Sequence, residues 1–367
     1  MKLRNRILVA LAIVVTLGFV SLAVALSYNA PCNASAGLPA GSDSMQGLVA
    51  RCYGAPEILK LERVAKPTPA DDQLLVKVHA AALNPVDWHT MRGSPYIMRL
   101  SSGIGSPTDV RVGVDFAGTV EAVGKSVTRF KPGDEVFGGG GGSVAEYLVV
   151  RESRGVALKP ANVTFEQAGS VGVAAVTALQ GLRDHGGIKS GQKVLINGAS
   201  GGVGTYAVQI AKHFGAEVTG VCSTRNVELV RSLGADHVID YTQQDFAEGT
   251  QRYDIVLDNV GNRSLSDLRS VLGSDGALVI VGAGKGDWIG PLSLALKATV
   301  VAPFVDQNLG FFVASLEQED MKFLGELMQA GKVTTVIDRR YPLSEAAKAM
   351  EYLETGRARG KVVVSLE

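Results

Sequence analysis

Cysteine is scarce in this sequence. Its three cysteines, Cys32, Cys52 and Cys222, are scattered over 367 residues. An odd set with such unrelated spacing predicts no disulfide framework, and it contains none of the C-x-x-C pairs that hold a structural metal. We therefore expect neither a disulfide-stapled fold nor a cysteine-bound metal.

The chain also lacks net charge, because 36 Lys and Arg residues balance 36 Asp and Glu residues. No basic run occurs beyond the N-terminus, so nothing favours nucleic acid as a partner. Apolar residues make up 46% of the chain and charged residues 20%, which is typical of a globular protein. The length is too great for one ordinary core and indicates two domains.

Residues 1–44 differ from the rest and form an N-terminal anchor or signal segment followed by a linker. Residues 7–26 carry no charge and follow Lys2, Arg4 and Arg6. Twenty helical residues span roughly 30 Å, the thickness of a bilayer core, so we expect contact with a lipid bilayer through this segment. Cleavage as a signal peptide and a true start at Met45 are the two alternatives.

Two different patterns of secondary structure are predicted after the linker. In residues 45–164, short strand-like segments alternate with turns, which predicts a partly open β-barrel. In residues 165–332, helices alternate with strands, which predicts a doubly wound parallel sheet with right-handed crossovers. A final helix, capped by Ser344, and the strand KVVVSL indicate that residues 333–367 return to the barrel. The fold class is therefore α/β.

The stretch VLINGASGGVG, residues 194–204, lies between a predicted buried strand and a predicted helix. Amides in the first turn of a helix have no internal partner, and the helix dipole favours an anion there. Gly201 and Gly202 let the backbone approach a pyrophosphate, and Gly204 lets the helix pack on the sheet. Ala199 stands where G-x-G-x-x-G has its first glycine, yet the strand and helix supply the context that this motif requires.

The second strand of this unit, EVTGVC, decides which dinucleotide is expected. A site for NAD normally has Asp or Glu at the end of that strand, to bind the ribose hydroxyls. Here Ser223 and Arg225 follow, and the segment contains no carboxylate. Because a hydroxyl and a guanidinium suit a 2′-phosphate, the sequence predicts NADPH.

Several further stretches occur in a characteristic order: YGAPEILKLE, VKVHAAALNPVDW, GVDFAGTV, KPGDEVFG, LGADHVIDY, DNVG and GRARGKVVV. With the glycine-rich stretch, they make residues 45–367 resemble the medium-chain dehydrogenase/reductase superfamily, in its zinc-free quinone oxidoreductase (ζ-crystallin-like) branch. The resemblance implies a GroES-like barrel, a Rossmann domain and an active site in the cleft between them. It also implies that a homodimer is a candidate assembly.

The resemblance implies that no catalytic zinc is bound. The Cys, His and Cys ligands of zinc-dependent relatives would fall near Asn84, at Val114–Asp115 and within VGVAAVTAL, where suitable ligands are missing. Without that Lewis acid, the expected reaction is hydride transfer to an acceptor already activated by conjugation, a quinone or an α,β-unsaturated carbonyl.

Site residues follow from the same resemblance. Asn84 and His89 are the catalytic candidates, and Asp87 is either a cleft residue or a cap on the turn after Pro85. The loop 91–107 is expected to cover the pocket. The predicted contacts to the cofactor are Ala199, Ser200, Gly201, Gly202, Val203, Ser223, Arg225, Tyr241, Asn259, Val281, Gly282, Ala283, Gly284, Phe311, Phe312, Val313 and Arg357.

Two other functions compete with a reductase. A non-catalytic NADPH-binding sensor or scaffold at the membrane would use the same glycine-rich stretch. A short-chain dehydrogenase needs Tyr-x-x-x-Lys, which this sequence does not contain. The predicted location conflicts with the predicted cofactor. Basic residues before the span favour an N-terminus inside the cell, which would put the enzyme outside the cytoplasm. NADPH is not expected there. A start at Met45 would make the protein cytoplasmic.

Overall fold

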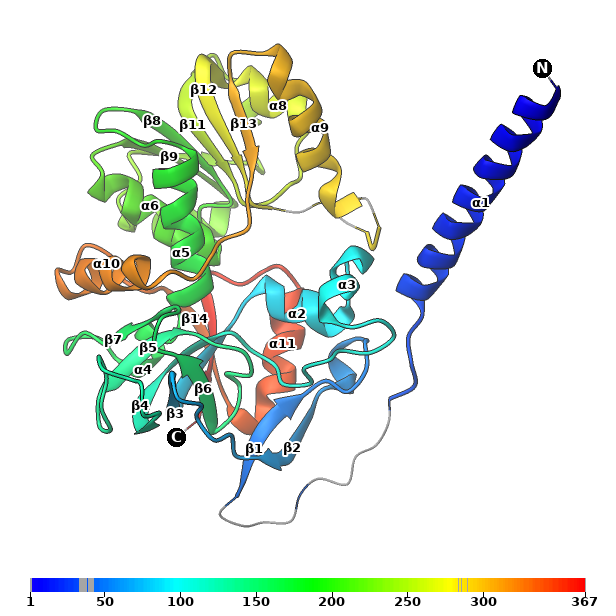
Figure 1. Cartoon of the computed structure of the whole chain (residues 1–367). Coiled ribbons are helices and arrows are strands. Elements are labelled where there is room, and N and C mark those ends of the chain that lie inside the picture. The colour runs from blue at the N-terminus through cyan, green and yellow to red at the C-terminus, as the bar shows by residue number, and fades with distance from the viewer. Residues whose placement is uncertain are drawn as a thin grey trace.

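The computed structural model describes residues 2–32, 38, 43–282, 284, 286–288 and 290–366. Helix α1 (Lys2–Ser27) projects away from a two-lobed body (Figure 1). A long apolar helix at the N-terminus agrees with the predicted span by length and composition.

The upper lobe in Figure 1 holds a six-stranded sheet in the order β10-β9-β8-β11-β12-β13. Every neighbouring pair is parallel, which confirms the predicted doubly wound sheet. Its central strands are nearly continuous apolar runs because helices cover both faces. The strands are β8 (Lys193–Asn197), β9 (Glu217–Cys222), β10 (His237–Asp240), β11 (Tyr253–Asp258), β12 (Leu272–Ile280) and β13 (Asn308–Phe311). The helices are α5 (Gly172–Gln180), α6 (Gly202–His213), α7 (Val227–Ser232), α8 (Leu265–Ser270), α9 (Ser293–Val301) and α10 (Gln318–Gln329).

The lower lobe is built on a seven-stranded sheet in the order β14-β15-β3-β4-β5-β7, with β6 also paired to β3. The strands are β3 (Gln73–Leu83), β4 (Asp115–Val123), β5 (Glu135–Gly139), β6 (Tyr147–Arg151), β7 (Val156–Leu158), β14 (Ile337–Pro342) and β15 (Lys361–Ser365). Strand β15 pairs antiparallel with β3, so the end of the chain does return to the barrel.

Smaller elements complete this lobe. Strands β1 (Ser44–Val49) and β2 (Lys60–Ala65) form an antiparallel pair. The helices are α2 (Pro85–Arg92), α3 (Arg99–Ser102), α4 (Phe165–Ala168) and α11 (Ala346–Glu354). Single turns in both lobes are η1 (Pro56–Ile58), η2 (Tyr96–Met98), η3 (Gly181–His185), η4 (Thr224–Asn226), η5 (Phe246–Glu248), η6 (Gly290–Leu292), η7 (Ala302–Phe304) and η8 (Leu343–Glu345).

The sequence pattern predicts one helix over residues 165–183, but the structure has the two helices α4 and α5 there, followed by η3. Helix α4 ends at Ala168, and α5 begins at Gly172. The buried carboxylate of Asp115 explains the restart, because its Oδ1 accepts a hydrogen bond from the Val173 amide at 2.7 Å. A Cβ atom on Gly172 would lie 2.4 Å from that oxygen, so glycine is required there.

The cap of the last helix lies one residue later than predicted, at Glu345 instead of Ser344. Ser344 lies inside the single turn η8, and α11 starts at Ala346 after Glu345. The sequence pattern predicts an apolar face of Ala346, Met350 and Leu353, of which Ala346 and Met350 are buried and Leu353 is half-buried.

The expectation of no disulfide framework was wrong, because Cys32 and Cys52 are bonded, with their Cα atoms 4.9 Å apart. The chain leaves α1 and runs back along the body, where Ala30 donates a backbone hydrogen bond to Gly105 at 2.8 Å. Two cysteines 20 positions apart thus meet through tertiary contacts that sequence spacing does not reveal. Cys222 is free and buried.

Candidate functional site

The glycine-rich turn joins β8 to α6 with a sharp reversal. Gly198 has a φ of 80°, which favours glycine because a side chain would meet its own backbone. A Cβ on Gly204 would lie 2.1 Å from the Gly198 carbonyl oxygen, so the first turn of α6 packs directly on the loop. The first backbone hydrogen bond of α6 is donated by the Thr205 amide to the Gly201 carbonyl. The amides of Gly202 and Val203 therefore have no acceptor within the helix.

The C-terminal segment runs alongside this turn. The Gly360 amide donates to the Ser200 carbonyl at 2.9 Å, and Gly201 and Gly360 form a parallel bridge. Gly360 has a φ of 90°, and its hypothetical Cβ would lie 2.3 Å from the Val336 carbonyl oxygen. The stretch just before β15 is thereby fixed against the predicted pyrophosphate position.

Polar side chains link the turn to the end of the second strand. Asn226 donates to Ser200 Oγ at 2.9 Å and to Ser223 Oγ at 3.3 Å. Arg225 is exposed, and its guanidinium donates to the Arg357 carbonyl at 2.9 Å. The two predicted 2′-phosphate residues therefore lie beside the glycine-rich turn and the segment before β15, where Arg225 remains accessible to an anion.

A carboxylate that the sequence prediction did not consider, Asp240, also lies at this rim. Its oxygens accept hydrogen bonds from the hydroxyls of Thr224, at 2.6 Å, and Thr242, at 2.8 Å. These donors lower the pKa of Asp240, first through the Thr224 hydroxyl. Because local donors already occupy this carboxylate, it is a poor acceptor for a ribose hydroxyl.

Three buried polar atoms on segments that adjoin the glycine-rich turn or the end of β8 have no hydrogen-bond partner among the described residues: Asn226 Oδ1, Asn259 Oδ1 and Arg359 Nε. Leaving such atoms unpaired costs about 1–3 kcal/mol each. Two amide acceptors and a guanidinium donor beside a glycine-rich turn suit a ligand with ribose hydroxyls and phosphates. The residues present therefore fit a dinucleotide.

The loops after β11 and β12 lie close to the end of β8 and to each other. Asn259 donates its side-chain amide to the Asn197 carbonyl at 3.1 Å. The amides of Val281 and Gly282 both donate to the Asp258 carbonyl, at 2.9 and 2.8 Å. A Cβ on Gly282 would lie 2.4 Å from the Val260 amide nitrogen, so these loops are in close contact.

The remaining predicted cofactor residues are more dispersed. Ala199 is fully buried, Gly284 is half-buried, and Tyr241, Phe311, Val313 and Arg357 are exposed. The ring of Phe312 stacks on His185, with 4.2 Å between centroids, so it is engaged at the end of α5. Ala283 lies outside the described residues. Contact of these residues with a cofactor stays a prediction.

Lys361 is the centre of a buried polar cluster facing the glycine-rich turn. Its ammonium donates to Asn84 Oδ1 and, at 3.0 Å, to Asp115 Oδ2. The Lys361 side chain is 2% exposed and that of Asp115 is 0% exposed. A Cβ on Gly202 would lie 3.5 Å from Lys361 Cδ, so the lysine stem packs against the turn itself. The cluster joins the barrel to the predicted pyrophosphate site.

Asp87 belongs to the same cluster through Asn84. Its Oδ2 accepts the Asn84 amide hydrogen at 2.7 Å, which is the capping role that we had considered as an alternative. Burial raises the pKa of Asp87 to about 7, and the nearby Asp115 carboxylate adds to this rise. The Asn84 amide and the Lys361 ammonium oppose it.

His89 lies one turn along α2. Its Nδ1 is 2.7 Å from the Ser94 carbonyl oxygen, which can accept a proton but cannot donate one. This contact fixes the tautomer with hydrogen on Nδ1 and leaves Nε2 as an acceptor. Burial lowers the pKa of His89, so the neutral ring is favoured at neutral pH.

The loop after α2 reaches from the barrel to the other lobe. Ser94 donates to Asp287 Oδ1 at 2.7 Å, and the Tyr96 amide donates to the Asp287 carbonyl at 2.7 Å. The rings of Tyr96 and Trp288 meet edge to face, with centroids 4.9 Å apart. These contacts join the loop 91–107 to the segment after β12, and its covering of the pocket stays a prediction.

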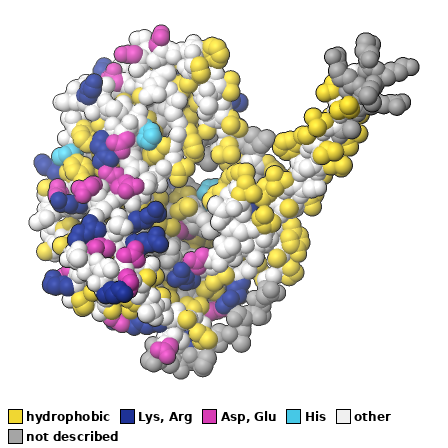
Figure 2. Space-filling model, viewed as in Figure 1, with side chains coloured by type: hydrophobic (Ala, Val, Ile, Leu, Met, Phe, Trp, Pro, Cys, Tyr) yellow, Lys and Arg dark blue, Asp and Glu magenta, His cyan; other side chains and the backbone are white. Residues whose placement is uncertain are grey.

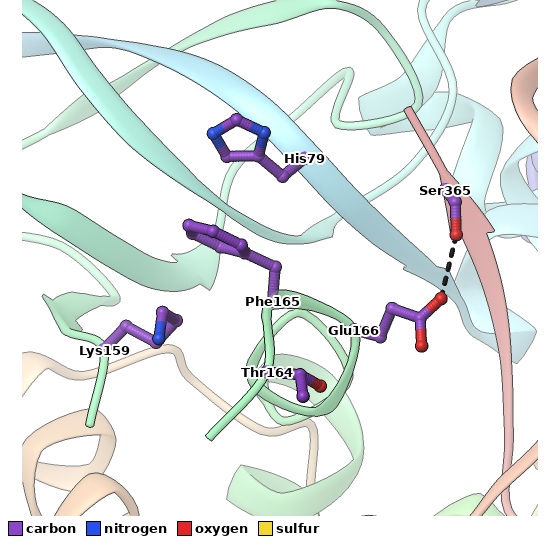
Figure 3. Close-up of a pocket in the computed structure, with 6 residues that line it drawn as sticks. All are labelled: His79, Lys159, Thr164, Phe165, Glu166 and Ser365. Atoms are coloured by element: carbon purple, nitrogen blue, oxygen red, sulfur yellow. Dashed lines mark hydrogen bonds between the residues drawn. The ribbon is translucent and has the colours of Figure 1, made fainter. Parts of the chain in front are cut away.

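A cavity of about 270 Å³ lies elsewhere on the barrel, lined by His79, Lys159, Thr164, Phe165, Glu166 and Ser365 (Figure 3). In Figure 3, the His79 and Phe165 rings lie near each other, and Ser365 donates to Glu166 at 3.0 Å. The Lys159 ammonium is already paired with Glu135 at 2.9 Å. None of these lining residues belongs to the glycine-rich turn or the Lys361 cluster, so the cavity is separate from the candidate site.

Two family models match this chain. The alcohol dehydrogenase GroES-like domain matches residues 70–161, and the zinc-binding dehydrogenase model matches residues 233–364. A 2-methylene-furan-3-one reductase of Solanum lycopersicum is 39% identical over 328 residues, which cover 85% of this chain and 76% of the relative. The chain belongs to the medium-chain dehydrogenase/reductase superfamily, in its quinone oxidoreductase branch.

Two further relatives support this membership of the superfamily. A chloroplastic NADPH-dependent alkenal/one oxidoreductase of Arabidopsis thaliana is 37% identical over 337 residues, covering 87% of this chain and 79% of the relative. A solved structure of the quinone oxidoreductase from Coxiella burnetii superposes with a TM-score of 0.77 at 31% identity, covering 88% of this chain and all of that one. The protein is therefore an oxidoreductase with the superfamily's fold.

The three segments where the resemblance predicts the zinc ligands of zinc-dependent relatives meet at the Lys361 cluster. Asn84 and Asp115, which lie in two of these segments, accept hydrogen bonds from the Lys361 ammonium, and the amide of Val173, from the third, donates to Asp115. The Lys361 ammonium thus lies between the side-chain oxygen atoms of Asn84 and Asp115. Within the described ranges, no group of three His, Cys, Asp or Glu side chains is placed to hold a metal ion.

Sequence reasoning missed the roles of Lys361, Asn226 and Arg359. For Lys361 a signal existed, because a lysine at the start of the apolar strand KVVVSL must find a partner if it is buried. No signal of that kind marks Asn226 or Arg359, whose unpaired atoms become evident only once the two lobes are in place.

Proposed function

We propose that this protein is a zinc-independent, NADPH-dependent reductase that transfers a hydride to a quinone or an α,β-unsaturated carbonyl. The observation that carries the proposal is the contact between the Lys361 cluster and the glycine-rich turn. It brings the segment holding Asn84 and His89 beside the turn that would bind the cofactor's pyrophosphate.

The cofactor assignment rests on the rim at Arg225. Its exposed guanidinium is positioned by Arg357, and Ser223 lies beside it, so a 2′-phosphate would find a charged donor and a hydroxyl. The competing acidic group, Asp240, is engaged by threonines. The Arabidopsis relative is named as NADPH-dependent, which agrees with this assignment.

The acceptor class rests on the chemistry of the polar cluster. Zinc requires three or four nitrogen, sulfur or oxygen ligands, and an ammonium would repel the ion. Without a Lewis acid to polarise a carbonyl, we expect an acceptor that conjugation has already activated. The names of the three relatives, a furanone reductase, an alkenal/one oxidoreductase and a quinone oxidoreductase, describe such acceptors.

The chain's own residues would bind and orient the reactants. When bound, NADPH supplies a hydride, which together with one proton reduces the acceptor and leaves NADP⁺. The amides of Gly202 and Val203 would hold the pyrophosphate, and Asn84, fixed by Lys361, would orient the reacting end. Burial lowers the pKa of His89, which favours the neutral ring, and its Nε2 would then bind a hydroxyl or relay a proton from solvent.

We further propose the two-domain division expected from sequence, with residues 45–164 and 333–367 as the substrate domain and residues 165–332 as the cofactor domain. Residues 7–26 would cross a bilayer. The basic residues before the span and the disulfide at Cys32 both favour the oxidising, non-cytoplasmic side for the body. On that side, activity requires a local supply of NADPH.

Steady-state kinetics test the proposal. The purified full-length protein, dialysed against a chelator, is assayed with NADPH or NADH and a panel of 1,4-quinones and enones. We expect consumption of NADPH in preference to NADH, at a rate that the chelator does not change. Tight NADPH binding without turnover on any acceptor would instead favour a non-catalytic sensor or scaffold.

A further inference from the structure

We propose that residues 94–105, here called the access loop, form a membrane-facing mouth of the active site, through which a bilayer-dissolved quinone or enone reaches the cleft. This inference rests on the proposed function for its chemistry. It extends that function by naming where the substrate resides and which surface admits it.

Helix α1 needs an apolar environment that the rest of the chain does not provide. Its segment Ile7–Ser27 has a mean hydropathy of 2.9, and none of the apolar window is buried. Large side chains along it, including Leu11, Val14 and Phe19, are more than half exposed. A helix that is hydrophobic all round and 21 residues long matches the thickness of a bilayer core.

Arg99 fixes the access loop to the end of this helix. Its guanidinium donates to the carbonyls of Leu26, at 2.8 Å, and Tyr28, at 2.9 Å. It also donates to Gly93 at 2.7 Å, and the rings of Tyr53 and Tyr96 cover its two sides. A cation at the C-terminal end of a helix satisfies carbonyls that the helix leaves unpaired.

Further contacts hold the loop at the same level as the end of α1. Ala30 donates to the Gly105 carbonyl at 2.8 Å, and the disulfide at Cys32 follows two residues later. The Tyr53 hydroxyl donates to Gly103 at 2.7 Å. Because Arg99 and Gly105 are both bonded to the segment leaving α1, a bilayer that covers α1 must reach its boundary at the loop.

The outer surface of the access loop is apolar. Ile97, Leu100 and Ile104 are 47%, 57% and 56% exposed. Figure 2 shows hydrophobic side chains gathered along α1 and over the neighbouring region where Figure 1 places α3. An apolar surface continuous with an uncovered apolar helix is the arrangement that a lipid surface would cover.

The inner side of the same loop reaches the candidate catalytic residues. The Ser94 carbonyl binds His89 Nδ1, and the Ser94 hydroxyl binds Asp287 across the cleft. The Tyr96 ring contacts Trp288 on the opposite lobe. About ten residues of chain thus connect the bilayer boundary with the cleft, so a lipophilic substrate leaving the membrane meets the access loop first.

The first test compares two acceptors with full-length protein in phosphatidylcholine vesicles. One is a benzoquinone with a long isoprenoid tail, dissolved in the bilayer, and the other is unsubstituted, water-soluble 1,4-benzoquinone. We expect Leu100→Asp to lower the ratio of kcat/KM for the tailed to the soluble quinone at least about tenfold. The matched control is Leu158→Asp, because Leu158 on β7 is equally exposed, at 58%, and lies away from α1.

An unchanged ratio in Leu100→Asp, or an equal fall in Leu158→Asp, would overturn the inference. If neither quinone is reduced by the wild type, the proposed function fails, and a second measurement decides the location of the loop. Leu100→Cys and Leu158→Cys are each labelled with a solvatochromic dye, since Cys222 is buried and the other two cysteines are bonded.

In vesicles, the dye at position 100 should shift its emission to shorter wavelength and be quenched by spin-labelled lipid. The dye at position 158 should do neither. Equal emission at the two positions would overturn a membrane-facing loop. A shift that appears without lipid and grows with protein concentration would assign the surface to a second copy of the chain, and would overturn it as well.

Discussion

The Lys361 ammonium lies 3.0 Å from the Asp115 carboxylate, in a place where neither side chain reaches solvent. The Lys361 ammonium also donates to Asn84. Removing one partner of a buried pair leaves an uncompensated charge, so we expect Lys361→Met to lower the free energy of unfolding by about 3–5 kcal/mol. Denaturant unfolding of the full chain measures the loss.

The matched control is the double variant Lys361→Met/Asp115→Asn, which leaves no buried charge at the pair. It should be less destabilised than Lys361→Met alone, because the amide can keep its hydrogen bond to the Val173 amide. Additive losses from the two substitutions would show that the pair does not act as a unit.

Asp87 should give the protein a distinctive dependence on pH. Burial raises the pKa of its carboxyl from 3.8 in the unfolded chain to about 7, with Asp115 adding to the rise and Lys361 opposing it. Between about pH 4 and pH 7 the folded protein keeps a proton that the unfolded chain has lost, so stability falls as pH rises through this window. Asp87→Asn keeps an acceptor for the Asn84 amide and removes the titration.

The measurement is Tm as a function of pH for the wild type and Asp87→Asn. The wild type should lose Tm toward pH 8 relative to the variant, and the two profiles should converge at acidic pH. Parallel profiles across the whole range would contradict a buried, protonated Asp87.

Arg225 should determine the preference for NADPH. A charge-assisted contact to the 2′-phosphate contributes about 1.5–3 kcal/mol, so Arg225→Ala should raise KM for NADPH roughly tenfold or more and leave KM for NADH unchanged. Arg231→Ala is the control, since Arg231 is an exposed arginine on α7 that pairs with Glu228. An equal rise in KM for both cofactors would show that Arg225 does not bind the 2′-phosphate.

The disulfide predicts how the thiols react. In the oxidised native protein, Cys32 and Cys52 are bonded and Cys222 is buried, with its thiol pKa raised by burial to about 11. A thiol reagent should therefore find almost no reactive group. Mild reduction should expose two thiols, and the third should appear on unfolding. Two thiols reacting without reductant would contradict the disulfide.

Loss of this disulfide should also lower stability. Closing a loop of this length contributes about 3 kcal/mol in the chain-entropy estimate. The double variant Cys32→Ser/Cys52→Ser should therefore unfold at lower denaturant concentration than the oxidised wild type, and reductant should not shift it further. A midpoint equal to that of the wild type would show that the bridge stabilises neither lobe.

The side of the membrane is tested by protease digestion of intact spheroplasts. The disulfide and the basic residues before α1 predict that external protease reaches the body, because disulfides persist on the oxidising side. Protection of the body until the membrane is disrupted would put it in the cytoplasm.

Much of the fold could be predicted because it depends on local pattern. The parallel sheet follows from apolar strands alternating with helices, and the position of Gly204 follows from the need for close packing. The disulfide could not be predicted, since it depends on how the chain leaves α1 and returns past Gly105. The restart of α5 depends on a hydrogen bond from Val173 to a carboxylate 58 positions earlier, on β4, which no local pattern encodes.

The candidate site divides in the same way. Asn84, His89 and the glycine-rich turn were recognisable from motifs, whereas Lys361 at their centre was not assigned a role. Its partners come from β3 and β4, and only the antiparallel pairing of β15 with β3 brings them together. Whether a charged side chain is buried depends on tertiary packing, so its role depends on partners that are far away in sequence.

The most direct test of the proposed reaction follows the transferred hydrogen. The full-length protein is incubated with NADPH deuterated at C4 of the nicotinamide and with an α,β-unsaturated ketone, and the product is analysed by NMR. The account predicts one deuterium at the β-carbon of the saturated ketone, with a solvent proton at the α-carbon. The experiment is done with deuterium on each of the two faces of the nicotinamide in turn. A saturated product that contains no deuterium in either case would contradict the account, and so would the absence of product despite bound NADPH.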